Sequence, residues 1–432
     1  MGLMGSAWGQ NGFNIPYSQF GIGVGDLPYT VPTLNRLGGV TATVSGSNFI
    51  NPFNPASYGS IGMESFVFDM GMLIQKTRLR NNSNHADDAD GNISHLMFGM
   101  PLTKWWKVAA GLLPYSVVDY ESVAEGTYTG NSIVKNIYEG SGSTSMVFLG
   151  NAFNILDGGE KGRRLQVGFN IDLLMGRINR TLSYLFTGSD TTYYMNKRRL
   201  KQTKIVNFLF DLGVQYWEPL NDNYTLGVGL TYKPYRKMDI KDEVLVYTYH
   251  ASDQSLCDTI FPAAGDDAEV LSSLERDHTI GIGLSLARNK KWMVAADATF
   301  AGWSGMKYTE GITPPLFGES TLDYGFYGHY ALAFEKTGDM DAPSYWGRIS
   351  WSLGAHFDQG AMRLNINGRK EVIDSWGCGL GATLPMRKGR SLLTLSAGYS
   401  SFGNQNLLQR NTLSFGISVS SCERWFVKRK YN

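Results

Sequence analysis

The fold is decided by a stretch near the end of the chain, which reads Leu413-Ser414-Phe415-Gly416-Ile417-Ser418-Val419-Ser420. Successive side chains of a β-strand point to opposite faces, so here the bulky apolar groups share one face and the small or polar groups share the other. Residues 376–384 and 393–400 alternate in the same way. A soluble sandwich would carry Lys, Glu and Arg on its second face, whereas here that face is Gly, Ser and Thr. The bulky face is therefore predicted to contact lipid and the small face to line a lumen.

The composition agrees with a membrane barrel. Only 18% of the 432 residues are charged, against about a quarter in soluble domains. The net charge of +1 gives no electrostatic case for nucleic acid as a partner. No apolar run reaches the length of about 18 residues that a spanning helix needs, so the alternation is the only membrane signal. The three cysteines, Cys257, Cys378 and Cys422, are too few and too widely spaced for a disulfide framework.

The N-terminal part of the chain divides into two segments. Ala7-Trp8-Gly9 has the small-x-small pattern that precedes signal-peptidase cleavage, so we assign residues 1–9 to the remainder of a signal peptide and expect the mature chain to begin at Gln10. Residues 10–64 are rich in Gly, Pro and Asn and follow no sustained period. They are either a disordered leader or a plug inside the barrel, and their aromatic residues favour a plug, or hatch.

From Ser65 onward we count about fourteen segments with period-two alternation. After the first, they lie at roughly 93–100, 105–122, 143–154, 163–184, 204–217, 224–234, 275–287, 292–303, 344–357, 361–371, 373–386, 390–401 and 409–420. The predicted fold is all-β, a transmembrane barrel of antiparallel strands with an N-terminal hatch in its lumen. We assign residues 65–420 to the barrel and residues 421–432 to a basic periplasmic tail.

The connections mostly alternate between short and long, as expected for short periplasmic turns and long outer loops. The long connections are predicted at roughly 80–92, 123–142, 185–203, 235–274 and 304–343. They can carry strand extensions, and Ser272-Ser273-Leu274-Glu275 is a candidate. One junction, near Val372, departs from the scheme, because an outer loop is expected there and the sequence provides almost none.

Alternation also directs a set of polar side chains toward the lumen, namely Asp69, Asp172, Asp211, Asp297, Arg348 and His356. The functional interpretation is either a network that holds the hatch or a ligand path that includes Arg348 and Asp297, with Arg348 binding a carboxylate. The other is a set of solvated residues that balance one another, since barrel lumens are normally polar. Both interpretations stay open.

No motif in the sequence nominates a metal site, a cofactor or an enzymatic activity. The acidic segment at 85–92 offers the oxygen ligands that calcium prefers, but it lacks the spacing of a calcium loop, and we interpret it as a solvated loop tip. The other histidines are scattered, without a pair of the kind that binds zinc. No GxSxG motif is present to provide a nucleophilic serine.

Several short motifs resemble the FadL-type family of long-chain fatty-acid transporters. They are Tyr17-Ser18-Gln19-Phe20-Gly21-Ile22-Gly23, Asn54-Pro55-Ala56 at the end of the hatch, Phe300-Ala301-Gly302-Trp303-Ser304 and the closing 424–430. The resemblance implies a fourteen-stranded barrel with a hatch, associated with the uptake of hydrophobic compounds. The leading motif differs from that of the best-known members, so the substrate does not follow from the resemblance.

Pro114 lies within a predicted strand, although proline cannot donate to a sheet ladder and a closed barrel has no edge to accommodate it. The functional hypothesis is that the ladder opens there and forms the lateral gap that the family resemblance implies. The alternative is an ordinary β-bulge.

The sequence thus favours an outer-membrane channel for hydrophobic, fatty-acid-like small molecules, by lumen binding and lateral diffusion. Its expected surroundings are membrane lipids and lipopolysaccharide. The rival interpretation is a non-enzymatic barrel subunit of an outer-membrane secretion or assembly complex, with outer-membrane or periplasmic protein partners.

Overall fold

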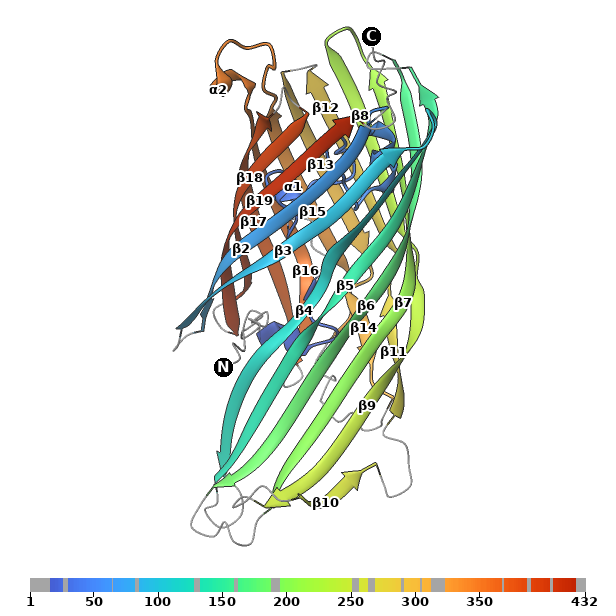
Figure 1. Ribbon diagram of the computed structural model, residues 1–432. Helices are drawn as coiled ribbons and strands as arrows, with labels where there is room; N and C mark the ends of the chain where they lie inside the picture. The colour runs from blue at the N-terminus through green and yellow to red at the C-terminus, as the bar shows by residue number, and fades with distance from the viewer. Residues whose placement is uncertain are drawn as a thin grey trace, which may run out of the picture.

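The structure is a computed structural model that describes residues 16–25, 30–63, 65–81, 85–127, 133–158, 162–187, 195–250, 256–262, 269–288, 291–303, 305–311, 323–366, 369–386, 390–404 and 407–424. Within them the chain forms a closed barrel of 14 antiparallel strands (Figure 1), which confirms the predicted fold class. In this part of the chain no helix is both long and apolar enough to cross a membrane.

The barrel strands follow one another in chain order around the ring. They are β2 (Ser65–Arg80), β3 (His85–Pro101), β4 (Trp106–Thr127), β5 (Ile133–Asp157), β6 (Arg164–Thr187), β7 (Met195–Pro219), β8 (Tyr224–Lys233), β12 (Thr279–Arg288), β13 (Trp292–Ala301), β15 (Tyr327–Lys336), β16 (Ser350–Ile366), β17 (Arg369–Met386), β18 (Ser391–Asn404) and β19 (Leu408–Arg424). Pairing of β19 with β2 closes the ring, from Gln409 opposite Arg80 to Arg424 opposite Ser65.

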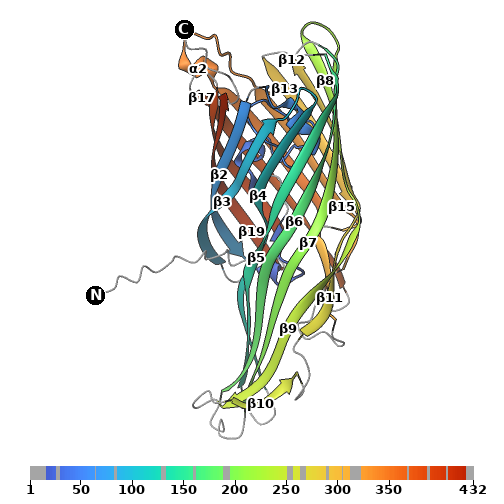
Figure 2. The ribbon, with the colours of Figure 1, turned by 45° about the vertical axis from the view of Figure 1, so that its right-hand side comes forward.

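Four further strands lie beyond one end of the ring. They are β9 (Arg236–His250), β10 (Leu256–Phe261), β11 (Glu269–Arg276) and β14 (Met306–Thr309). Pairing of β7 with β9, β9 with β11 and β11 with β14 prolongs the barrel wall. Together with the long strands β4 to β7 they form the extension below the barrel in Figure 2. We call this the extended end, and the opposite end, which carries the turns 102–105 and 220–223, the short-turn end.

The two faces of β19 differ as predicted. In β19, Phe415 and Ile417 are 51% and 49% exposed on the outside, whereas Ser418 between Ile417 and Val419 is fully buried. An apolar outer face is what a lipid bilayer requires of a barrel.

The predicted strands of the last third need one correction. Residues 344–357 and 361–371 are not two strands, because β16 runs through the irregularity between Asp358 and Met362 and continues to Ile366. Conversely β15 lies inside the predicted loop 304–343. The prediction divided β16 into two strands and missed β15, so its count of fourteen strands is still correct. Val372 lies within β17 rather than at a junction.

Most of the residues predicted to form long loops belong to strands instead. Thus β2 reaches Arg80 and β3 begins at His85, so the acidic segment 85–92 is part of a strand and not a loop tip. Asp87 pairs there with Arg78 on β2, with Nε to Oδ1 at 2.8 Å. The candidate extension at 272–275 belongs to β11, and β19 runs four residues past the predicted barrel end.

The hatch fills the lumen of the barrel. Its described elements are η1 (Pro16–Gln19), β1 (Val24–Gly25), α1 (Pro32–Asn35) and η3 (Pro55–Ser60). Its buried apolar residues, such as Leu34, Leu37 and Tyr58, form one core with inward-facing side chains of the barrel, such as Phe148.

Inward-facing glycines provide the space that the hatch occupies. A Cβ on Gly354 of β16 would overlap the backbone of Leu37, and one on Gly213 of β7 would overlap the Asn54 side chain. Only glycine permits such close backbone approach. The small inner face predicted as the lining of a lumen is therefore largely a docking surface for the hatch.

Candidate functional site: the opening between β3 and β4

The ladder between β3 and β4 is much shorter than either strand. It runs from Pro101 opposite Lys107 to Leu96 opposite Leu112 and ends there. Beyond this point β3 continues to His85, paired with β2, and β4 continues to Thr127, paired with β5. The barrel wall therefore contains an opening between two long strands at the extended end.

Pro114 lies two residues beyond the last pair of this ladder. It stands opposite Ser145 of β5, and the register of β4 against β5 shifts between Pro114 and Ser116. Tyr115 and Ser116 are both buried, at 6% and 3% exposure, which is the signature of a bulge that places consecutive side chains on one face. Because proline has no N–H, it cannot donate a bond across the opening.

A cavity of about 390 Å³ lies at the opening. Its walls are Asn92 and Ile93 of β3, Pro114 with Val117 to Asp119 of β4, and Ser141 to Ser145 of β5. One wall is thus largely apolar and another is rich in hydroxyl groups, so the cavity offers a small ligand both apolar contact and hydrogen-bond partners.

The first hatch motif lies on the free edge of β4. Val24 pairs with Val117, and Gly25 pairs with Ser116. The Ser116 hydroxyl donates to the Ile22 carbonyl at 2.7 Å. The Asp119 N–H donates to the Ser18 hydroxyl at 3.0 Å. The hatch therefore supplies part of the hydrogen bonding that β3 would otherwise give.

The two glycines of this motif allow the bend that brings it there. Gly21 and Gly23 have φ of 59° and 96°, in the left-handed region that other residues rarely adopt. At the start of the motif, Tyr17 donates its hydroxyl to the Leu408 carbonyl at 2.6 Å, at the tip of β19. Burial raises the pKa of the Tyr17 phenol to about 12, so it remains a donor.

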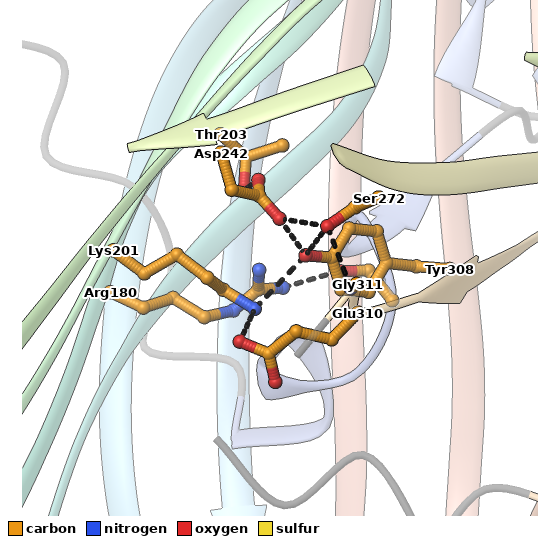
Figure 3. Close-up of polar contacts among 9 residues, drawn as sticks. Arg180, Lys201, Thr203, Asp242, Ser272, Tyr308, Glu310 and Gly311 are labelled. Carbon is orange, nitrogen blue, oxygen red and sulfur yellow. Dashed lines mark hydrogen bonds and ion pairs between the residues drawn. The ribbon is translucent and has the colours of Figure 1, made fainter. Parts of the chain in front are cut away.

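A buried polar cluster adjoins this motif through Arg180 (Figure 3). Arg180 of β6 stands directly opposite Lys201 of β7, and both point inward. The Lys201 ammonium lies 3.2 Å from the Tyr308 hydroxyl and 3.4 Å from the Glu310 carboxylate. Tyr308 in turn donates to Asp242, which also accepts from Thr203 at 2.6 Å and Ser272 at 2.5 Å.

Arg180 is the least satisfied member of this cluster. Its side chain donates from Nη2 to the Gly21 carbonyl. No described residue accepts a hydrogen bond from its Nε or Nη1, although the residue is only 3% exposed. A buried guanidinium with free donors is a binding group for a carboxylate or another acceptor.

The residues proposed from the sequence lie in different places. Asp297 of β13 faces the lumen and accepts the N–H groups of Thr41 and Ala42 at 2.6 Å and 2.7 Å, so it holds the hatch. Asn54, of the Asn54-Pro55-Ala56 motif, is the N-cap of η3 and donates to the Ala42 carbonyl at 2.6 Å.

Arg348 does not line the lumen, which corrects its predicted position. It ends the short helix α2 (Tyr345–Arg348) in the turn between β15 and β16. Its Nε donates to the Ala342 carbonyl of the same turn at 2.9 Å. The strand 344–357 predicted there begins only at Ser350, so alternation could not place this side chain.

Arg180 and Lys201 were not singled out from the sequence. Lys201 falls in the predicted loop 185–203, and alternation alone cannot show that an inward Arg faces an inward Lys. The basic run from Lys197 to Lys204 was the available signal.

Comparisons with known proteins agree with this architecture. The family model BamG matches residues 2–432. No curated protein sequence matches the chain.

Solved structures resemble the chain in fold, with a TM-score of 0.54 in each of three cases. The Pseudomonas putida toluene transporter TodX is 15% identical, with 94% of this chain and 98% of that chain covered. The Ralstonia pickettii toluene transporter TbuX is 12% identical, with 92% and 99% covered. A Pseudomonas aeruginosa FadL homologue is 12% identical, with 90% and 98% covered.

Proposed function

The chain belongs to the BamG family, whose model spans hatch and barrel together, and we propose that this unit is an outer-membrane channel for hydrophobic small molecules. The observation that carries the proposal is the opening between β3 and β4, where β3, β4 and β5 line a cavity of about 390 Å³ beside the part of β4 that pairs with the hatch. The route involves binding and diffusion and no enzymatic step. The toluene transporters of similar fold are consistent with an apolar ligand.

The proposed orientation follows from the two ends of the barrel. Outer-membrane barrels turn tightly on the periplasmic side and extend further outside. The short-turn end would therefore lie in the periplasm and the extended end outside the cell. In that orientation the extension stands among the sugars of lipopolysaccharide, and its outer face carries cross-strand ion pairs such as Lys204 with Glu243 and Lys241 with Glu269.

The proposed path leads from the extended end into the lumen and sideways through the opening. Arg180 would hold the polar group of an amphipathic ligand while the apolar part lies toward the opening. It takes the role that the sequence assigned to Arg348. A ligand leaving past Pro114 and Ile93 would enter the apolar layer of the membrane, because Ile93 is 57% exposed on the outer face.

The test is uptake of a hydrophobic probe by cells with and without this chain. A radiolabelled long-chain fatty acid and toluene serve as amphipathic and hydrocarbon probes. We expect faster uptake of at least one probe in expressing cells, and co-purification of apolar compounds with the barrel. Equal uptake in both strains, with no bound compound by mass spectrometry, would argue against a channel.

A second candidate function is a barrel subunit of a secretion or assembly complex. One observation favours it, namely an exposed aromatic turn at the short-turn end, which a channel does not need. Purification from native membranes distinguishes the two functions, because a subunit would be recovered with a stoichiometric protein partner.

A further inference from the structure

The turn between β15 and β16 is built differently from the other described turns of the short-turn end. The turns 102–105 and 220–223 only connect their strands, whereas residues 337–349 form a longer turn that contains α2. Both views draw α2 beyond the rim of the barrel (Figures 1 and 2). A barrel needs only short turns on this side, so closing the sheet does not require this structure.

Three large apolar side chains are exposed on this turn. Trp346 is 73% exposed, Met340 is 50% exposed and Tyr345 is 45% exposed. Trp and Tyr dominate the binding energy of protein interfaces, and Met is enriched there. Trp105, at the turn 102–105 of the same end, is also exposed, at 56%, but its ring packs against Phe153 with ring centroids 6.0 Å apart.

Internal hydrogen bonds hold the exposed side chains in a defined arrangement. The Asp339 N–H donates to the Gly347 carbonyl at 2.9 Å, and Arg348 donates to the Ala342 carbonyl at 2.9 Å. The Thr337 N–H donates to the Lys291 carbonyl at 2.9 Å, which ties the turn to its neighbour. A preorganised surface loses little conformational freedom on binding.

The charges on the turn distinguish a protein partner from the membrane surface. Asp339 and Asp341 are exposed beside the apolar side chains. Segments that bind anionic headgroups carry Lys and Arg beside their apolar residues. Here the single cation within residues 337–349, Arg348, donates to carbonyls of its own turn. The acidic rim would be repelled by lipid phosphates and attracted to a basic protein surface.

We infer that residues 339–348 are a docking site for a periplasmic protein that presents an apolar pocket within a basic rim. Trp346 is the anchor in the pocket, and Asp339 and Asp341 pair with the rim. The inference goes beyond transport and rests on the proposed function only for the orientation of the barrel.

The experiment places a photo-crosslinking phenylalanine analogue at position 346 of the full chain in native membranes. We expect one discrete protein adduct of constant stoichiometry, identified by mass spectrometry, and recovery of the same protein with the unmodified chain. In the Trp346→Ala variant and in the Asp339→Lys, Asp341→Lys variant, that recovery should fall about tenfold or more, the scale of a central interface residue. The Trp105→Ala variant, altered at the same end, should retain the partner.

Three outcomes would overturn the inference. They are the absence of a discrete adduct, recovery that is equal in the Trp346→Ala and Trp105→Ala variants, and quenching of Trp346 by brominated lipids in vesicles. The last outcome would assign the turn to the membrane surface.

Uptake of the hydrophobic probes is measured on the same variants. Uptake no faster than in cells that lack the chain, with intact partner recovery, would contradict the channel alone, and uptake through the chain without any recovered partner would contradict the docking site alone.

Discussion

Leu96 and Leu112 form the last main-chain pair between β3 and β4. Past this pair the two strands carry on for ten or more residues without bonding to each other among the described residues. The free edge of β4 is bonded to the hatch instead. The opening is thus bordered by the element that fills the lumen, and movement of residues 16–25 would alter both together.

The first prediction concerns Pro114. Replacement by Val restores one N–H donor to β4 and favours a continuous ladder, so uptake of the hydrophobic probe should fall several-fold while barrel insertion is unchanged. The control is Pro101→Val, at the closed end of the same ladder, which should leave uptake as it was. Unchanged uptake in a folded Pro114→Val variant would remove the lateral route and leave an ordinary bulge.

A second prediction tests Arg180. In the Arg180→Met variant the guanidinium is lost, so binding of a fatty-acid probe should weaken about tenfold, the value of one charge-assisted hydrogen bond. Toluene uptake should stay the same, because a hydrocarbon has no acceptor for this group. Arg177, which lies on the same strand and is exposed, provides the control variant Arg177→Met. Equal loss of both probes would point to a structural role for Arg180.

The third prediction concerns the fit between hatch and barrel. A side chain on Gly354 meets the backbone of Leu37, so Gly354→Val should displace the hatch and raise the ion conductance in planar bilayers. Deletion of Tyr17 to Ser57 gives the reference conductance of an emptied barrel. The Gly126→Val variant is the control, because a Cβ there has no neighbour within 4 Å. If the barrel that lacks Tyr17 to Ser57 inserts into the membrane but does not conduct ions, something other than the hatch blocks the lumen.

The fourth prediction concerns the seam where the ring closes. Asp69 of β2 accepts from the Ser418 and Ser420 hydroxyls of β19, both at 2.9 Å, and lies 3.1 Å from His95 Nε2. Asp69→Ala leaves these buried donors unsatisfied, so we expect a loss of at least about 2 kcal/mol in the free energy of unfolding. Ser420→Ala removes one donor and should cost about 1 kcal/mol. Urea unfolding in vesicles measures both, and equal small losses would contradict this account.

The fifth prediction is a pH dependence at Tyr17. Its pKa is raised to about 12 by burial, so its contribution to hatch docking is complete below pH of about 10 and is lost as pH rises through about 12. Conductance of the wild-type barrel should therefore increase across this alkaline range. The Tyr17→Phe variant lacks the phenol and should show a smaller change. Identical pH profiles in the wild-type chain and the Tyr17→Phe variant would show that the Tyr17 hydroxyl does not hold the hatch.

The fold could be predicted from the sequence where strands cross the lipid. There one face must be apolar and the other small, so β17 to β19 show their period without ambiguity. In the extension both faces meet polar surroundings, and residues such as Lys204 and Glu243 occupy the outer face. The period disappears there although the strands continue, which is why their length was missed.

The errors in the last third also have a physical cause. Asp358-Gln359-Gly360 has the composition of a turn, and Gly360 does adopt a positive φ of 66°. Its N–H is bound by the Asp374 carboxylate at 2.7 Å, so the residues form a bulge and the strand continues. In β15, Ala331 and Ala333 face the lumen, and apolar side chains on both faces conceal the alternation.

The contacts of the hatch across the β19 and β2 seam constrain how this protein is made. Asn35 donates to Ser414, 379 residues away in the chain, and the Ile50 N–H donates to Asp69 on the other side of the seam. These bonds can form only when the first and last parts of the chain are together. Pairings so distant in sequence are slow to form. We therefore expect the barrel to close around a hatch already in place, so that the start of each chain acts as a template for the last step of its assembly.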